Sequence, residues 1–281
     1  MNIEFKLEQM YRNMINLEIG GTAVPESGAT KFGGVPDVPA DFIWPTFKTS
    51  SFDDNEVKER PLSFLAQFNC EEIAKFDKDD LLPHQGLLSF FYEMESQRWG
   101  FDPKDAGCAR VFWFKDISSL TSSKFPENLC EDYRFPSLNI LAKAEKSLPD
   151  WTDFSTGREV SNDDYDQFEE ARVMLGVEEP ELCSKLLGWP DTIQNNMTQE
   201  CELINRGYYL GGIWKDIPND EKIYAQQNSL ENWLLLFQLD TVSNQDFELM
   251  FGDCGRLYFY IRREDLLSCR FDRIWLIQQC Y

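Results

Sequence analysis

Three short apolar runs in the first half of the chain have the length of buried β-strands. They are Leu62–Phe68, Leu87–Tyr92 and Ala109–Phe114, and each is bounded by polar residues or glycine. Continuous apolar runs of this length, rich in aromatic residues, are typical of strands that are covered on both faces. The segment Glu71–Ala74, close behind the first run, is expected to be a short helix.

Other segments have the spacing of a helix. In residues 1–19 the apolar positions predict one helix, which Gly20 and Gly21 would end: Leu7, Met10, Tyr11, Met14 and Ile15. A second helix is predicted around Phe168, and a third from Glu178 to Gly188. The polar segment Lys48–Arg60 is expected to be a loop or an insertion.

Four landmarks recur in the same order in the two halves of the chain. The first half contains Gly34–Asp37, Phe64–Asn69, Gly86–Phe91 and Ala109–Phe114. The second half contains Gly188–Asp191, Leu235–Asp240, Gly255–Tyr260 and Asp272–Ile277. Because the spacing changes only where loops are expected, we interpret the chain as two diverged copies of one β-rich unit.

The predicted fold class is therefore α+β and β-rich. A single unit would expose a sheet face or an edge, so we expect two pseudo-symmetric β-sheet units packed into one body, with a few peripheral helices. That body would span residues 1–281. Copy one would occupy about 30–116, an acidic helical connector about 145–187, and copy two about 188–281.

The chain is strongly acidic, with 27 Lys and Arg against 49 Asp and Glu and a formal net charge of −22. Such a charge repels phosphate backbones and anionic lipid, so we expect neither nucleic acid nor a membrane as a partner. A basic protein would be attracted instead. The acids are densest in the connector, where they would form the outer face of the helix around Phe168: Asp163, Asp164, Asp166, Glu169 and Glu170.

The compartment is inferred from missing signals. The first twenty residues contain no apolar signal segment, and no apolar run approaches the length of a membrane span. The eight cysteines are dispersed without a C-x-x-C pair and are expected to stay reduced. We therefore expect a cytoplasmic protein.

Motifs for catalysis and cofactor binding are also missing. The sequence has no G-x-G-x-x-G, no G-x-x-x-x-G-K-[ST], no H-E-x-x-H and no G-x-S-x-G. We expect no cofactor and no metal. His84, the single histidine, stands in a turn that enters a strand, where a turn role is favoured over a catalytic one.

Polar residues associated with the repeat are the candidate ligand-binding set: Gln67, Gln238, Asp37, Asp191, Asp240 and Asp253. The favoured interpretation of the two glutamines is a buried amide that satisfies backbone groups where the copies meet. The alternative is a pair of amides that orient a ligand in a central cleft. The aspartates suit turns, but converging carboxylates would bind a cation or act as acid and base. Arg110 and Arg273 are expected to be strand-edge charges paired with acids.

Several of these blocks resemble the YwqG-like family of bacterial proteins of unknown function. The blocks are Phe32–Pro36 (FGGVP), Leu62–Asn69 (LSFLAQFN), Gly86–Phe91 (GLLSFF), Lys185–Pro190 (KLLGWP), Trp233–Gln238, Gly252–Ile261 (GDCGRLYFYI) and Gln279–Tyr281. The resemblance covers most of the chain and implies a duplicated, β-rich α+β fold. It implies no activity, ligand or catalytic residue.

We interpret the chain as an acidic protein-binding module without catalytic activity. Missing catalytic motifs, the negative charge and the many aromatic residues that would line a surface or groove support this reading. One alternative is an enzyme or small-ligand receptor with a polar site in the cleft between the two repeats. Another is a nucleic-acid mimic, which requires acids arrayed at phosphate spacing.

Overall fold

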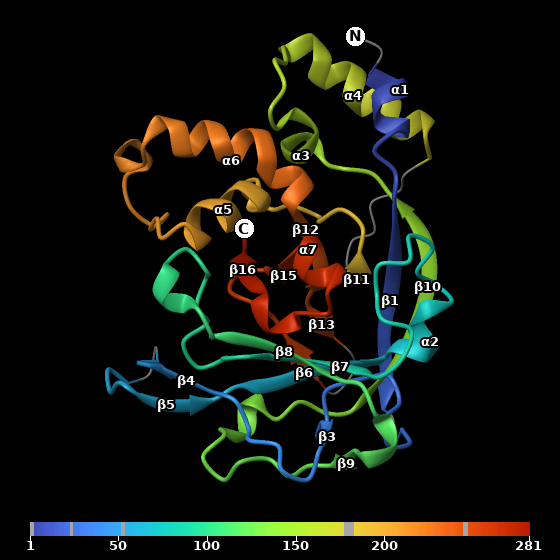
Figure 1. The fold of residues 1–281 in the computed structure, drawn as a ribbon, viewed down its shortest axis with the longest axis vertical. Helices are drawn as coiled ribbons and strands as arrows, with labels where there is room; N and C mark the ends of the chain where they lie inside the picture. The colour runs from blue at the N-terminus through green and yellow to red at the C-terminus, as the bar shows by residue number, and fades with distance from the viewer. Residues whose placement is uncertain (1–2, 23–24, 52–53, 177–182, 244–246) are drawn as a thin grey trace.

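A ten-stranded antiparallel sheet organises the chain in the computed structural model, which describes residues 3–22, 25–51, 54–176, 183–243 and 247–281 (Figure 1). Across the sheet the strands are β16 (Trp275–Gln279), β15 (Arg256–Arg262), β12 (Trp233–Leu239), β11 (Ser184–Leu187), β1 (Arg12–Thr22), β10 (Leu138–Ser147), β2 (Lys31–Phe32), β6 (Ser63–Asn69), β7 (Leu87–Tyr92) and β8 (Ala109–Phe114). Three two-stranded ladders lie outside it: β3 (Asp37–Val38) with β9 (Thr121–Ser122), β4 (Thr46–Thr49) with β5 (Lys58–Pro61), and β13 (Val242–Ser243) with β14 (Glu248–Leu249).

Helices fill the connections. The α-helices are α1 (Ile3–Glu8), α2 (Cys70–Ala74), α3 (Trp151–Ser155), α4 (Asn162–Met174), α5 (Met197–Asn205), α6 (Asn219–Asn232) and α7 (Arg263–Leu267). Short 3₁₀ turns are η1 (Pro103–Asp105), η2 (Ile117–Ser119), η3 (Glu131–Tyr133), η4 (Trp214–Asp216) and η5 (Phe271–Arg273). No helix in the described ranges is long and apolar enough to cross a membrane.

The long antiparallel pair β1–β10 joins the strands of the two halves into one sheet. Arg12 pairs with Ser147 and Ile19 with Ile140, and β11 pairs with the other side of β1. The two expected units are thus parts of one continuous sheet instead of two sheets packed face to face. The structure confirms a β-rich fold, while the duplication and the boundaries drawn from it stay predictions.

The sheet curls around an aromatic core. Phe90 of β7 and Phe259 of β15 stand near opposite ends of the strand order, yet their ring centroids are 5.3 Å apart. The edge strands also approach each other: Trp275 Nε1 of β16 donates to Gly100 O at 2.9 Å, in the connection between β7 and β8. Gly100 has φ +79°, and a Cβ there would lie 1.9 Å from Leu276 O, so this approach requires glycine.

Two groups of helices lie at different places around the sheet, and α1 and α4 lie beyond the end of β1 and β10 (Figure 1). Met197, Cys201 and Ile204 of α5 pack on the outer face of β12 around Trp233, and α6 packs beside α5. The helices α1, α3 and α4 form a separate cluster around Phe168. The exposed face of α4 carries the acidic side chains, in the place predicted for this helix.

Several predicted elements are confirmed and others are wrong. The three apolar runs are β6, β7 and β8, and the helices α2 and α4 lie where expected. The N-terminal helix, however, ends at Glu8, because Met14 and Ile15 belong to β1, buried between two neighbouring strands. Leu186 and Leu187 belong to strand β11, and residues 177–182 of the predicted third helix lie outside the described residues. The segment Lys48–Arg60 contributes to a β4–β5 hairpin.

Candidate functional site

Asp37 and Gln67 form a buried cluster with Lys31. Lys31 of β2 pairs with Gln67 of β6 in the sheet, and Asp37 lies at the start of β3. Gln67 Nε2 donates to Asp37 Oδ2 at 2.6 Å and to Ala29 O at 2.8 Å. Asp37 N–H donates to Gln67 Oε1 at 3.0 Å, and Lys31 Nζ lies 3.2 Å from Asp37 Oδ2. The amide therefore fastens the loop before β3 to the sheet.

Asp191 and Gln238 form a cluster of the same kind with Lys185. Gln238 Nε2 donates to Asp191 Oδ2 at 2.6 Å and to Cys183 O at 2.7 Å. Asp191 N–H donates to Gln238 Oε1 at 2.9 Å, and Lys185 Nζ lies 2.7 Å from Asp191 Oδ1. The three hydrogen bonds of Gln238 correspond to those of Gln67, but Lys185 contacts the carboxylate oxygen that Gln238 does not, whereas Lys31 and Gln67 share one oxygen.

Both carboxylates are held in the charged form. Burial alone would raise the pKa of Asp37, but the hydrogen bond from Gln67 and further donors outweigh it, so the pKa is lowered. Burial opposes ionisation of Asp191 as well, and the Lys185 ammonium outweighs that effect, so this pKa is lowered too. Carboxylates that already have such partners are poorly suited to donating a proton to a ligand.

Asp240 belongs to the second cluster, whereas Asp253 lies apart. Arg256 Nε donates to Asp240 Oδ2 at 2.6 Å, and its Nη1 donates to Asp191 O at 3.1 Å. Asp253 is exposed in the turn before β15, where its backbone oxygen accepts a hydrogen bond from Tyr281 N–H at 3.1 Å. Both residues belong to the ligand-binding set predicted from the repeat, and the fold separates them.

The six candidate residues do not converge on one cleft. The strands β10 and β1 stand between β2 and β11, and no hydrogen bond or ion pair joins the two clusters within the described ranges. Each glutamine satisfies backbone groups inside its own half, not at a meeting point of the two halves. A ligand-binding role for the six stays a prediction.

His84 is exposed, and its Nε2 lies 2.5 Å from Asp80 Oδ1. A nucleophile hydrogen-bonded to this imidazole is not found in the described part of the chain. The residues that the structure describes contain no group of three or more His, Cys, Asp or Glu side chains that could hold a metal ion.

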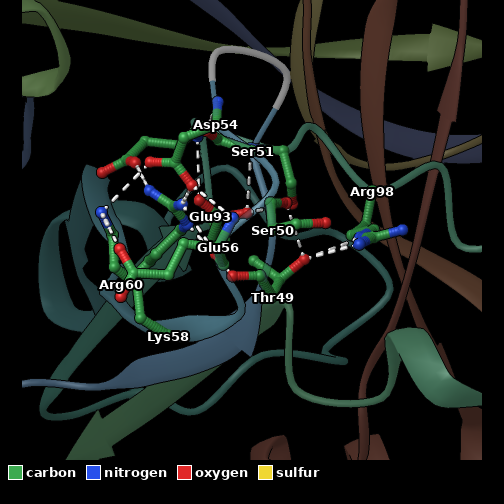
Figure 2. Close-up of polar contacts among 11 residues, drawn as sticks. Thr49, Ser50, Ser51, Asp54, Glu56, Lys58, Arg60, Glu93 and Arg98 are labelled. Atoms are coloured by element: carbon green, nitrogen blue, oxygen red, sulfur yellow. Dashed lines mark hydrogen bonds and ion pairs between the residues drawn. The ribbon is translucent and has the colours of Figure 1, made fainter.

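A third charged cluster, centred on the buried Arg60 at the β4–β5 hairpin, was not predicted (Figure 2). Arg60 is 2% exposed, its Nη2 lies 2.6 Å from Asp54 Oδ1, and its Nη1 pairs with Glu95. Arg60 Nε donates to Thr49 O at 3.1 Å, and Arg98 Nη2 donates to Thr49 Oγ1 at 2.6 Å. The contacts tie the hairpin to the loop after β7. Because Arg60 pairs with two acids here, we interpret the cluster as structural.

A cavity of about 370 Å³ lies where the two edges of the sheet approach each other. We call it the seam cavity. Its lining includes three arginines, Arg110 of β8, Arg262 at the end of β15 and Arg273 of η5. It also includes three acids: Glu264, Asp265 and Asp272. Arg262 Nη2 lies 3.1 Å from Glu202 Oε2. Arg273 Nη1 lies 3.8 Å from Asp265 Oδ1, which agrees with the acid pairing expected for this residue, but Arg273 lies in η5 and not in a strand. Arg110 differs from that expectation, because no acidic partner is found for it among the described residues.

The α5–α6 connection and the start of α6 carry several exposed hydrophobic side chains. Five of them are between 41% and 67% exposed: Tyr209, Ile213, Trp214, Ile223 and Tyr224. We call this group the α5–α6 surface. The Arg206 guanidinium lies 3.9 Å from the Tyr224 ring centroid and Lys222 Nζ lies 5.5 Å from that of Trp214, so the connection and α6 are in contact. The exposed apolar residues of this surface were not predicted from the sequence.

A cavity of about 330 Å³ lies beside this surface. We call it the Glu200 pocket, and its lining is Asn195, Asn196, Gln199, Glu200, Leu210 and Trp214. Glu200 is 9% exposed, and its Oε2 has no hydrogen-bond partner among the described residues. Burial raises the pKa of this carboxyl to about 8. A buried carboxyl of this kind, in a cavity with an aromatic wall, is the least satisfied polar group that we find beside an exposed apolar surface.

Residues 30–280 match a protein-family model described as a domain of unknown function, DUF1963. The match extends from just before β2 to the end of β16. It contains the Gln67 and Gln238 clusters, the seam cavity and the α5–α6 surface. A search of curated proteins finds no match to the chain.

Proposed function

We propose that this chain, which belongs to the DUF1963 family of domains of unknown function, is a protein-binding module without catalytic activity. Its partner would dock on the α5–α6 surface. The supporting observation is the five hydrophobic side chains that are between 41% and 67% exposed there. Exposed apolar groups that gather in one place favour association, and Tyr and Trp supply much of the binding energy of protein interfaces. We also propose that, within this family, the chain is YwqG-like.

The partner is proposed to be basic. The net charge of −22 creates a negative potential around the molecule, which raises the encounter rate with a positively charged protein. The exposed acids of α4 add to this potential at a distance from the surface itself: Asp163, Asp166, Glu169 and Glu170. In this account charge attracts the partner and the apolar side chains hold it.

Site-specific photo-crosslinking tests the location of binding. A photoreactive amino acid replaces Ile213 on the surface and, as a matched control, Leu141 on β10, since the two side chains are 67% and 66% exposed. We expect a discrete crosslinked protein with the probe at position 213 and none with the probe at position 141. Equal crosslinking at both positions, or none at 213, contradicts the proposal.

A second candidate function is favoured by the seam cavity. The cavity is lined by residues of both expected copies. The alternative interpretation of the sequence was a small-ligand receptor with its site between the copies. None of the six candidate residues lines this cavity. Arg110 points to an anionic ligand, because an arginine without an acidic partner is suited to bind a carboxylate or phosphate. Thermal unfolding with inorganic phosphate tests this function. Stabilisation of the natural chain that is lost in Arg110→Gln supports it, and equal stabilisation of both proteins contradicts it.

A further inference from the structure

We propose that the partner inserts a lysine or arginine side chain into the Glu200 pocket, with the Glu200 carboxylate as the acceptor. The inference rests on the proposed function, because the pocket adjoins the α5–α6 surface and shares Trp214 with it. It adds what the proposed function leaves open, namely the chemical group that the surface recognises.

The unsatisfied oxygen of Glu200 is the first support. Glu200 lines the pocket, is 9% exposed, and has no hydrogen-bond partner for Oε2 within the described ranges. A buried carboxyl oxygen without a donor is unfavourable, so a donor that arrives with a partner gains more here than at a hydrated surface. Among side chains, Lys and Arg carry donors and no acceptor, which suits this oxygen once the carboxyl has released its proton to solvent and is ionised.

The walls of the pocket are the second support. Leu210 and Trp214 offer apolar surface to the aliphatic stem of a lysine or arginine, whose charged end can then reach the carboxyl. The Trp214 ring already has Lys222 Nζ at 5.5 Å from its centroid, so the ring stands where a cation can approach it. A neutral donor would gain less from both the ring and the carboxyl.

The pocket is held in shape before any partner binds. Asn196 caps α5 by accepting from Gln199 N–H at 3.0 Å, and its Nδ2 donates to Asp153 Oδ1 at 2.6 Å. Gln279 of β16 donates to Asn195 O at 3.0 Å. Leu210 N–H donates to Phe101 O at 2.9 Å. Preformed walls reduce the ordering cost of binding, which favours a specific side chain over a non-specific contact.

Charge favours a cation over a neutral donor. Burial raises the pKa of Glu200 to about 8, so the free carboxyl is mostly protonated at neutral pH. An ammonium or guanidinium group against it stabilises the ionised form and makes the hydrogen bond charge-assisted. The net charge of −22 acts in the same direction.

Selection of random peptides tests the inference. A displayed peptide library is bound to the full chain, and the enriched peptides are synthesised and titrated against the natural chain, Glu200→Gln, Ile213→Asp and Leu141→Asp. Glu200→Gln keeps the shape of the neutral carboxyl, while Ile213 and Leu141 are exposed to the same extent, so the last two variants are a matched pair. Each peptide is also synthesised with its basic residue replaced by norleucine or citrulline.

We expect enriched peptides that share a lysine or arginine. Their affinity should fall about ten- to a hundred-fold in Glu200→Gln and on replacement of the basic residue, the range for a hydrogen bond to a charged group. It should also fall in Ile213→Asp and stay unchanged in Leu141→Asp. Peptides that need Ile213 but lack a basic residue, or that bind Glu200→Gln equally well, overturn the inference and leave the proposed function standing. Failure to obtain peptides sensitive to Ile213→Asp counts against both.

Discussion

Replacing Glu200 with glutamine should change the pH dependence of stability by an amount that follows from the structure. Glu200 is 9% exposed, and burial raises its pKa from a model-compound value of 4.5 to about 8. Glutamine has nearly the same shape and does not titrate. The variant therefore isolates the proton equilibrium of one side chain.

The direction of the pH effect on stability follows from the protonation of Glu200 in the unfolded and folded chains. Between pH 4.5 and pH 8 the unfolded chain releases the Glu200 proton while the folded chain retains it. The stability that this carboxyl contributes is thus fully present below the unfolded pKa and is lost as pH rises through the folded pKa. The loss is about 1.4 kcal/mol for each pH unit, or roughly 5 kcal/mol over the whole interval as an upper bound.

Urea unfolding of both proteins at about pH 6 and about pH 7.5 measures the effect. The stability of Glu200→Gln relative to the natural chain should rise by roughly 2 kcal/mol between the two conditions. Burial also raises the pKa values of Glu93, Asp105 and Asp153, but these groups titrate in both proteins and cancel in the difference. A difference that does not change with pH would mean that Glu200 is ionised in the folded chain, and it would refute the reasoning.

Three further predictions concern stability and are measured by urea unfolding. Gln238→Met removes a buried amide that bonds three backbone or carboxylate groups and should cost about 2–4 kcal/mol, whereas an unchanged midpoint would show that those groups find other partners. Gly100→Ala places a Cβ 1.9 Å from Leu276 O and should destabilise far more than Gly176→Ala, which has a similar positive φ and nothing within 4 Å; equal effects would contradict the close approach. Arg60→Met removes the partner of Glu95, while Asp54 keeps its ion pair with Lys58, and should cost about 3 kcal/mol. High salt should not produce the same loss in the natural chain, because the Arg60 guanidinium is buried.

The strands that the sequence predicted are those whose apolar pattern is local. Leu87–Tyr92 is apolar throughout and is β7, buried along its whole length. Its neighbours β6 and β8 were found by the same signal. Here the pattern alone determines burial on both faces, so a single sequence is sufficient.

The strands that join the two halves were missed. The apolar residues of β1 have helical spacing. β10 contains Lys, Ala and Glu, which favour helices. The local sequence therefore predicts a strand in neither segment. Both become strands because each pairs with a neighbour that is far away in the sequence, Ile15 with Ala144 for example. Long-range pairing overrides local propensity in such strands, and this is why the single curled sheet was not predicted.

The ligand-binding role of the candidate residues stays a prediction. The repeat paired Gln67 with Gln238 and Asp37 with Asp191, but it did not predict that each glutamine bonds the aspartate of its own half. It gave no information on Glu200, which has no counterpart in the repeat. The raised pKa of Glu200 depends on its burial in a pocket that Leu210 and Trp214 of the α5–α6 connection help to line, and burial of a glutamate cannot be inferred from its own helix.

Amide hydrogen exchange tests the central claim most directly. The full chain is compared alone and in complex with the protein that crosslinks at position 213. The account predicts slower exchange over residues 205–224 in the complex and unchanged exchange over α4, whose acids act only at a distance. Slower exchange over α4 or at the seam cavity, with none over 205–224, would contradict the claim that the α5–α6 surface is where this chain binds its partner.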